Sequence, residues 1–176
     1  ATIHDISALL SFDLSPLSFN FRQIIGRLYR YFAFYKLVKK SIIIFTVSQT
    51  SKIDIRAYLK SKNIKSPNIF VVPNAPGIQE FKPKKKNKSF LCITGNSPQK
   101  NHKIIFKSLQ YLEKDTLKGW DLYLVGLDKG RIFHHSSGVR IIIKKYLNSK
   151  EIKKLFIQSY CLIFPSLYES FGVPLL

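Results

Sequence analysis

Three short segments of this sequence carry charged or titratable side chains directly after a run of apolar residues. The first is "ITGNSPQKN", which leaves an apolar run through Gly95 and contains Lys100. Glycine permits a tight turn, the start of a helix offers free N–H groups, and lysine adds a mobile cation, so this loop could hold a diphosphate. The alternative is an ordinary turn between a strand and a helix, since a lone glycine before a helix is a weak motif.

The second segment is "FPSLYESFGVPLL", which carries Glu169 after another apolar run. A carboxylate accepts hydrogen bonds from hydroxyl groups, and the backbone N–H groups of Phe171 and Gly172 could meet an anionic or sugar ligand. The alternative is that Glu169 is a solvated loop residue and that Gly172 only forms a turn. Both interpretations stay open on the residues alone.

The third segment is His4–Asp5, at the end of the apolar opening "ATI". Histidine there could act as a general acid or base, donate a hydrogen bond to a substrate hydroxyl, or serve structure alone. Cys92 and Cys161 lie inside apolar runs without a neighbouring histidine cluster, and no HExxH motif occurs. The sequence therefore suggests neither a metalloenzyme nor a hydrolase triad, and we expect no cofactor and no metal.

Buried strands alternate with helices around these segments, which predicts an α/β fold with parallel sheets. Apolar residues at helical spacing predict the helices, and continuous apolar runs predict the strands. The predicted helices cover residues 20–40, 51–62, 102–114 and 148–159, and the predicted strands cover 41–48, 69–73, 89–95, 120–126, 139–143 and 160–166. Asn148 followed by Glu151 predicts a capping box at the start of the last helix. We expect the strand at 41–48 to be buried on both faces.

Residues 74–88 combine proline, glycine and a lysine run with little apolar content, which predicts a linker. We therefore expect residues 1–73 to form part of one Rossmann-like domain and 89–176 part of a second. In doubly wound sheets, ligands bind beyond the carboxyl ends of the strands. All three chemistry-bearing segments would follow strand ends, so the predicted site lies at those edges.

The chain carries 29 Lys and Arg against 10 Asp and Glu, a formal net charge of +19, so it is expected to meet anions. Nucleic acid, an acidic membrane surface and phosphate-bearing small molecules all fit. A basic module for nucleic acid or membrane would use the basic residues interleaved with Tyr and Phe in the 20–40 helix: Arg22, Arg27, Arg30, Lys36, Lys39 and Lys40. The alternative is a helix packed by its aromatic side chains with a solvated basic face. No apolar run approaches the roughly 18 residues of a spanning helix.

Several stretches, taken in order, resemble the retaining group 1 glycosyltransferases, family 4 of the sugar-nucleotide transferases, which have the GT-B fold. The stretches are "TIHD", "FTVSQTSKIDI", "IFVVPNAPG", "ITGNSPQKN", "WDLYLVG" and "FPSLYESFGVPLL". The last is the most specific, because it is close to the family pattern Pro-Ser, two residues, Glu-Gly-Phe-Gly, one residue, Pro. Asn96 and Gln99 stand where the family often has Arg, and Ser170 replaces a usual Gly.

The resemblance implies a cleft between two Rossmann-like domains, with the acceptor on the N-terminal side and the nucleotide sugar on the C-terminal side. It implies that Lys100 contacts the donor diphosphate and that Gly95, in the same loop, is also a donor-binding residue. It also implies that Glu169 is a catalytic residue that contacts the donor sugar, with Ser170, Phe171 and Gly172 as further donor-binding residues. His4, the second catalytic residue on this resemblance, would face the cleft from the acceptor domain.

The expected partners are a nucleotide sugar and a glycan or lipid-linked acceptor, as in polysaccharide biosynthesis, without nucleic acid. The expected location is cytoplasmic, with peripheral association to an acidic inner membrane face as a further expectation. In the family a second Glu follows the first after seven residues and binds the ribose, and its place comes immediately after Leu176. We therefore expect the chain to be an incomplete segment that transfers no sugar by itself.

Overall fold

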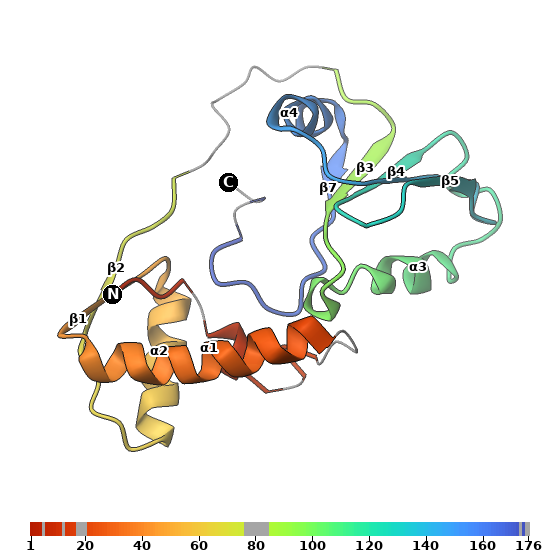
Figure 1. Ribbon diagram of the computed structural model, residues 1–176. Helices are drawn as coiled ribbons and strands as arrows, with labels where there is room; N and C mark the ends of the chain where they lie inside the picture. Colours follow the sequence, from red (N-terminus) through yellow and green to blue (C-terminus); the bar gives the residue numbers. More distant parts are fainter. Residues whose placement is uncertain (5, 12, 17–20, 76–84, 173, 175–176) are drawn as a thin grey trace. The chain divides into compact units, whose positions relative to one another are not determined.

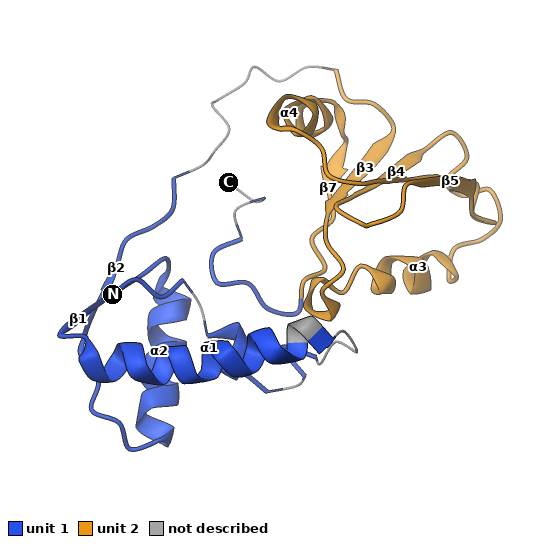
Figure 2. Cartoon of the chain, viewed as in Figure 1, with its two compact units in different colours: residues 1–76, 167–176 blue, residues 77–166 orange. Residues whose placement is uncertain are grey.

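The described chain contains helices and mostly parallel strands joined by loops, so the protein has the predicted α/β fold (Figure 1). The computed structural model describes residues 1–176 except 5, 12, 17–20, 76–84, 173 and 175–176. The chain divides into two compact units, unit 1 with Ala1–Pro76 and Leu167–Leu176 and unit 2 with Gly77–Ser166 (Figure 2).

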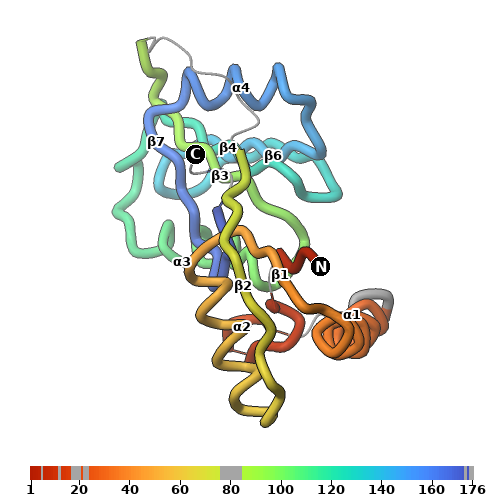
Figure 3. Tube along the Cα trace, turned by 90° about the vertical axis from the view of Figure 1, so that its left-hand side faces the viewer, coloured from red at the N-terminus to blue at the C-terminus, as the bar shows by residue number. Residues whose placement is uncertain are grey.

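Unit 1 is built from two strands and two long helices in the order helix, strand, helix, strand. Its elements are the short helix η1 (Ser7–Leu9), α1 (Phe21–Lys40), β1 (Ile43–Thr46), α2 (Gln49–Ser61) and β2 (Asn68–Val71). β1 and β2 are parallel with Ile44 opposite Ile69, and Figure 3 shows them side by side with α2 running along them. Thr2 pairs with Phe45 as an isolated parallel bridge, so the opening residues continue this sheet without forming a strand of their own.

The core of unit 1 lies on one face of this small sheet. Ile44 and Ile69 point from the two strands toward apolar side chains of both helices. The full buried cluster is Ile3, Ile6, Phe34, Val38, Ile44, Ile55, Leu59 and Ile69. Helical spacing in the sequence therefore placed α1 and α2 correctly, because each helix buries one stripe against the strands.

The opposite face of the same sheet is open, which corrects the prediction that the 41–48 strand is buried on both faces. Ile43 and Phe45 of β1 are 40% and 41% exposed, and Phe70 of β2 is 50% exposed. Among the described residues, both helices of unit 1 contribute to the core on the other face. A continuous β-branched run thus indicated the strand but not which of its faces is covered.

Unit 2 contains a five-stranded sheet in the order β5-β6-β4-β3-β7. Its elements are β3 (Ser89–Ile93), η2 (Pro98–Lys100), α3 (Lys103–Leu109), β4 (Asp121–Val125), β5 (Arg131–His134), β6 (Arg140–Lys144), α4 (Ser149–Gln158) and β7 (Cys161–Leu162). β7, β3, β4 and β6 are parallel, and β5 pairs with β6 in the antiparallel direction. β5 was not predicted from the sequence, and α3 and β7 are shorter than predicted.

Helices α3 and α4 lie on opposite sides of the unit 2 sheet (Figure 1). Ile105 and Leu109 of α3 are buried in a cluster with Cys92 of β3 and Leu124 of β4. The predicted capping box of α4 is confirmed, because Asn148 and Glu151 exchange backbone-to-side-chain hydrogen bonds of 2.9 and 3.0 Å.

The boundary between the two units falls near the predicted linker, of which residues 76–84 lie outside the described part of the chain. Residues 167–176 were predicted to belong to the second domain, whereas the described residues among them group with unit 1. Within the described ranges, no helix combines the length and apolar character that crossing a bilayer requires.

Candidate functional site

The 95–101 loop follows the carboxyl end of β3, at the edge where ligands bind in parallel sheets. A short 3-10 turn, Pro98–Lys100, ends in Asn101, whose φ of 49° is left-handed. The space where a Cβ of Gly95 would lie is empty to 4 Å, which leaves room for a ligand beside the backbone. Glycine is therefore not required at position 95 by backbone geometry, and the left-handed turn of the loop is made at Asn101.

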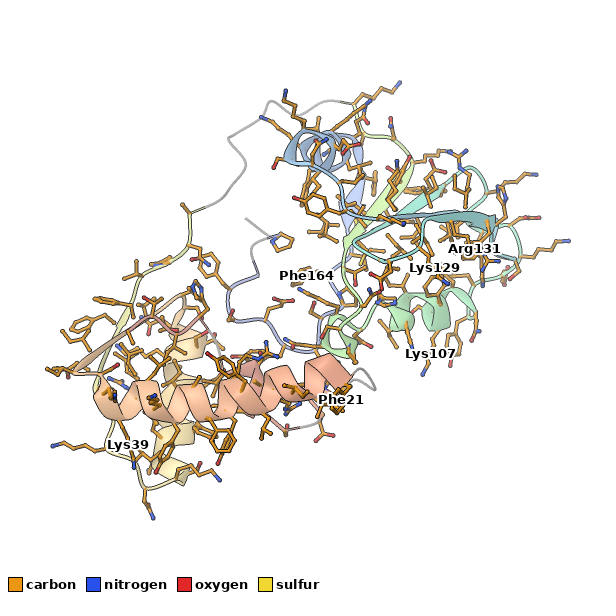
Figure 4. All side chains as sticks on the ribbon, in the orientation of Figure 1. Phe21, Lys39, Lys107, Lys129, Arg131 and Phe164 are labelled. Carbon is orange, nitrogen blue, oxygen red and sulfur yellow. The ribbon has the colours of Figure 1, made fainter. Side chains whose placement is uncertain are left out.

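The 95–101 loop is tied to the carboxyl end of β7, the neighbouring strand of the sheet. The Asn101 side-chain amide donates a hydrogen bond of 3.2 Å to the Pro165 carbonyl. The Lys100 ammonium lies 5.9 Å from the centre of the Phe164 ring, within the range of a cation–π contact. Figure 4 shows Phe164 on the segment that leaves β7. Two strand ends thus hold the lysine of the predicted diphosphate loop.

The next strand of the sheet also supports this loop. Gly126 follows β4 with a φ of 106°, and a side chain there would overlap the Thr94 carbonyl oxygen. Only glycine therefore lets the chain after β4 pass this close to Thr94, the residue directly before the 95–101 loop.

Burial changes the acid–base properties of two side chains next to the loop. It raises the pKa of the Cys92 thiol to about 11, and the Lys100 cation opposes that shift. Burial also lowers the pKa of His102, with help from the Lys103 charge and against a hydrogen bond with the Gly95 backbone. The His102 Nδ1 lies 3.4 Å from the Thr94 hydroxyl oxygen. Lys100 thus exerts an electrostatic effect within unit 2 that reaches the buried end of β3.

Residues 167–172, which carry the predicted sugar-binding carboxylate, pack within unit 1. The Tyr168 hydroxyl donates a 2.7 Å hydrogen bond to Oδ2 of Asp54, and the Ser170 carbonyl accepts a 2.5 Å hydrogen bond from the Ser48 hydroxyl. Glu169 lies between these two anchors and is half-buried. Gly172 is buried with a φ of 73°, a conformation that glycine adopts without strain.

His4 follows the bridge between Thr2 and β1 and is exposed. Asp5 lies outside the described residues. Across the described part of the chain, no three His, Cys, Asp or Glu side chains come together as a metal site would require.

The predicted site residues therefore fall into two groups. Gly95 and Lys100 belong to unit 2, whereas His4, Glu169, Ser170, Phe171 and Gly172 belong to unit 1. Three residues that anchor these groups within their own units were not predicted: Asn101, Ser48 and Asp54. An asparagine directly after the loop lysine was a usable signal, since Asn tolerates the left-handed region.

The family model "Glycosyl transferases group 1" matches residues 77–176 of the chain. The curated protein O-antigen chain mannosyltransferase RfbU of Salmonella typhimurium is 29% identical over 185 aligned residues, which cover 98% of this chain. The chain spans 47% of the length of that relative. No solved structure matches this chain with significance.

Proposed function

The chain belongs to the group 1 glycosyl transferases, and we propose that it supplies donor-binding residues of an enzyme that moves a sugar from a nucleoside diphosphate to a glycan or lipid-linked acceptor. The observation that carries this proposal is the 95–101 loop, where Lys100 is held at the ends of β3 and β7. A diphosphate placed there would meet a lysine and the open backbone at Gly95.

The proposed reaction exchanges one bond at the anomeric carbon of the sugar. The bond from this carbon to the diphosphate oxygen breaks, and its electron pair stays on the diphosphate. The acceptor hydroxyl oxygen forms the new bond, and its proton passes to the leaving diphosphate. Negative charge grows on that diphosphate in the transition state, so a fixed cation such as Lys100 accelerates the step.

We further propose that the configuration of the sugar is retained and that the complete enzyme has the two-domain GT-B arrangement. Both rest on the likeness of "FPSLYESFGVP" to the family 4 pattern. The name of the matched relative suggests mannose as the first sugar to test and a polysaccharide as acceptor. Glu169 would accept hydrogen bonds from sugar hydroxyls, with the backbone from Ser170 to Gly172 beside it, and His4 would face the acceptor.

The proposed reaction needs no metal ion, because Lys100 and backbone N–H groups would carry the charge of the diphosphate. Chelation with EDTA should therefore leave transfer unchanged, and a loss of activity that Mg²⁺ or Mn²⁺ restores would contradict this part.

The function is tested with the complete product of the gene that contains this chain. Nucleoside diphosphate sugars carrying mannose, glucose or galactose are offered with a glycan acceptor, and NMR reports the anomeric configuration of the product. We expect transfer from one donor with retention, and the 176 residues alone should give none. Absence of transfer from every donor, or inverted product, would contradict the proposal.

We also propose that α1 holds the protein at the acidic cytoplasmic face of a membrane. One side of this helix presents Phe21, Ile25, Leu28, Phe32 and Tyr35 at alternating spacings of four and three residues, with exposed fractions of 73%, 51%, 57%, 63% and 42%. Such a stripe lies along one face of a helix. The helix has no acidic residue, and lysines gather toward its end.

The basic side chains of α1 differ in their availability to a partner. Arg27 donates hydrogen bonds of 2.7 and 2.8 Å to the carbonyls of Ser15 and Leu10, so it fixes the preceding loop. Arg30, Lys36 and Lys39 are exposed. The side chain of Arg22 lies outside the described residues. Figure 4 shows Phe21 and Lys39 near opposite ends of α1. An exposed apolar stripe with lysines is typical of a helix that lies in a membrane interface.

Vesicle binding tests the docking proposal. Each lysine near an anionic surface contributes about 1 kcal/mol, so changing Lys36, Lys39 and Lys40 to Gln should weaken binding to phosphatidylserine vesicles roughly a hundredfold. The matched control changes three lysines on or beside the α4 surface, Lys150, Lys153 and Lys154, to Gln. An equal loss in both triple variants would contradict docking through α1. Tighter binding to RNA or DNA than to vesicles at the same salt would favour the nucleic-acid alternative.

A further inference from the structure

We propose that Ser48 and Asp54, at the start of α2, are positioning residues for Glu169. This inference rests on the proposed role of Glu169 in binding the donor sugar. All three residues belong to unit 1, although more than a hundred positions separate Glu169 from Ser48 and Asp54 in the sequence.

The two neighbours of Glu169 are held from the same short stretch of helix. On one side the Tyr168 hydroxyl donates to Asp54 Oδ2 at 2.7 Å. On the other side the Ser170 carbonyl accepts from the Ser48 hydroxyl at 2.5 Å. The Ser51 hydroxyl also lies 3.4 Å from that carbonyl oxygen. The backbone of Glu169 is therefore tied down immediately before and immediately after the carboxylate.

The anchoring side chains are themselves rigid. Ser48 is the N-cap of α2, and its hydroxyl oxygen accepts the Ser51 N–H at 3.0 Å while its proton goes to Ser170. Ser51 is fully buried, and Asp54 follows it after three residues on the same side of the helix. A helix start with its cap satisfied loses little freedom when it binds the 167–172 segment.

Anchors on both sides of a ligand-binding carboxylate lower the entropy cost of ordering it when the sugar arrives. A residue held within a small fraction of an ångström keeps its hydrogen bonds to the substrate, and a loosened residue loses part of them. Ser48 and Asp54 need not touch the donor for this effect. If Ser48 and Asp54 act by positioning, their effect on kcat/KM should disappear once Glu169 is replaced by a residue without a carboxylate.

The first test removes one hydroxyl in the complete gene product. Tyr168→Phe should lower kcat/KM for the nucleotide sugar about five- to tenfold, the size of one lost hydrogen bond, and should leave the KM of the acceptor unchanged. In a Glu169→Gln background, Tyr168→Phe should lower kcat/KM less than twofold, because Tyr168 would act only by holding the Glu169 carboxylate in place. Equal losses in both backgrounds would overturn the proposal, since a purely structural residue acts independently of Glu169.

The second test separates the capping role of Ser48 from its contact with Ser170. Ser48→Asp keeps an acceptor for the Ser51 N–H but has no proton to donate, whereas Ser48→Thr keeps both functions. We expect Asp to lose as much donor kcat/KM as Tyr168→Phe and Thr to stay within about twofold of the native protein. Similar activity of the Asp and native forms, with unchanged circular dichroism, would contradict a role for Ser48 in positioning.

Hydrogen exchange examines the anchors without any substrate. In this chain the amides of residues 169–172 should exchange more slowly than in the Tyr168→Phe variant, while α4 amides stay equal in both. If exchange is unchanged, the anchors do not hold the segment and the proposal fails. If exchange changes but no nucleotide sugar is turned over, the proposed function fails and the positioning role fails with it.

Discussion

Two segments of this molecule present a charged residue of the candidate site, and they are held in opposite ways. The 95–101 loop lies between neighbouring elements of one sheet, and its anchor, Asn101, directly follows Lys100. The 167–172 segment is fixed by Ser48 and Asp54, which precede it by 122 and 114 positions. The first segment therefore carries its own anchoring side chain, which bonds a backbone carbonyl 64 positions later at the neighbouring strand end. The second segment is held by side chains that come from another part of the chain.

This difference separates what a short motif can specify from what it cannot. The 95–101 loop itself contains the asparagine that makes its left-handed turn and bonds the Pro165 carbonyl, and the lysine that carries its charge. The 167–172 segment needs Ser48, whose local role is to cap α2, and Asp54, which lies within that helix. Substitutions in the 95–101 loop should therefore change its charge and its turn geometry. Substitutions that affect the 167–172 segment should change how firmly its backbone is held.

The largest effect is expected for Lys100→Ala in the complete gene product. Loss of the cation that we propose to meet the leaving diphosphate should cost on the order of 2 to 4 kcal/mol of transition-state stabilisation, seen mainly in kcat. Steady-state kinetics with the accepted nucleotide sugar measures this loss. Lys103→Ala is the matched control, since Lys103 is exposed on α3 and its removal changes the net charge equally. Native turnover in a folded Lys100→Ala protein would show that the loop is only a turn.

A smaller loss is expected for Glu169→Gln, which keeps the shape but removes the negative charge. Hydrogen bonds to charged groups contribute about 1.5 to 3 kcal/mol, so kcat/KM should fall by that amount and discrimination between donor sugars should narrow. Competition between two donor sugars measures the discrimination. An unchanged sugar preference would place the recognition of the sugar elsewhere.

Asn101→Gly should have a moderate effect, because glycine accepts the left-handed backbone but cannot bond the Pro165 carbonyl. We expect a loss of about 1 kcal/mol, mainly as a higher donor KM. Asn101→Ala should lose more, since alanine is strained at a φ of 49°. If the Gly and Ala variants both keep the donor KM of the native protein, the hydrogen bond between Asn101 and Pro165 is unimportant for donor binding.

The smallest effect concerns stability and pH at His102. Burial lowers the pKa of His102 in the folded state, so the unfolded chain takes up a proton first as pH falls below about 6.5. The folded protein should lose stability in this range, and the loss should level off below the lowered folded pKa. Thermal unfolding of native and His102→Gln proteins at pH 7 and 5 checks this, with a smaller decrease expected in the variant. Equal decreases would assign the pH dependence to other groups.

The elements of this fold were largely predictable because their patterns are local. Helical apolar spacing located α1 and α2, and the Asn148 and Glu151 pair located the start of α4. β5 was not predicted because two of its four residues, Arg131 and His134, are polar and leave only two apolar residues between them. β7 was predicted too long, because the apolar run continues beyond the two residues that pair with β3.

The candidate site was predictable only in part. Lys100 and Glu169 were chosen for their charge and their place after a strand, and both roles remain proposals. The contacts of Ser48 and Asp54 with the 167–172 segment could not be predicted, because a serine before a helix predicts only a cap. Burial on both faces of β1 was wrongly predicted, since a run of apolar residues does not say how many layers cover it.

The open face of the unit 1 sheet affects how molecules of this protein interact in solution. Ile43, Phe45 and Phe70 form a water-facing apolar surface on a chain with a net charge of +19. At low ionic strength, mutual repulsion keeps such molecules apart, whereas at physiological salt the repulsion extends only about 8 Å. Added salt therefore brings apolar faces into reach of each other, and the purified chain should become less soluble as ionic strength rises.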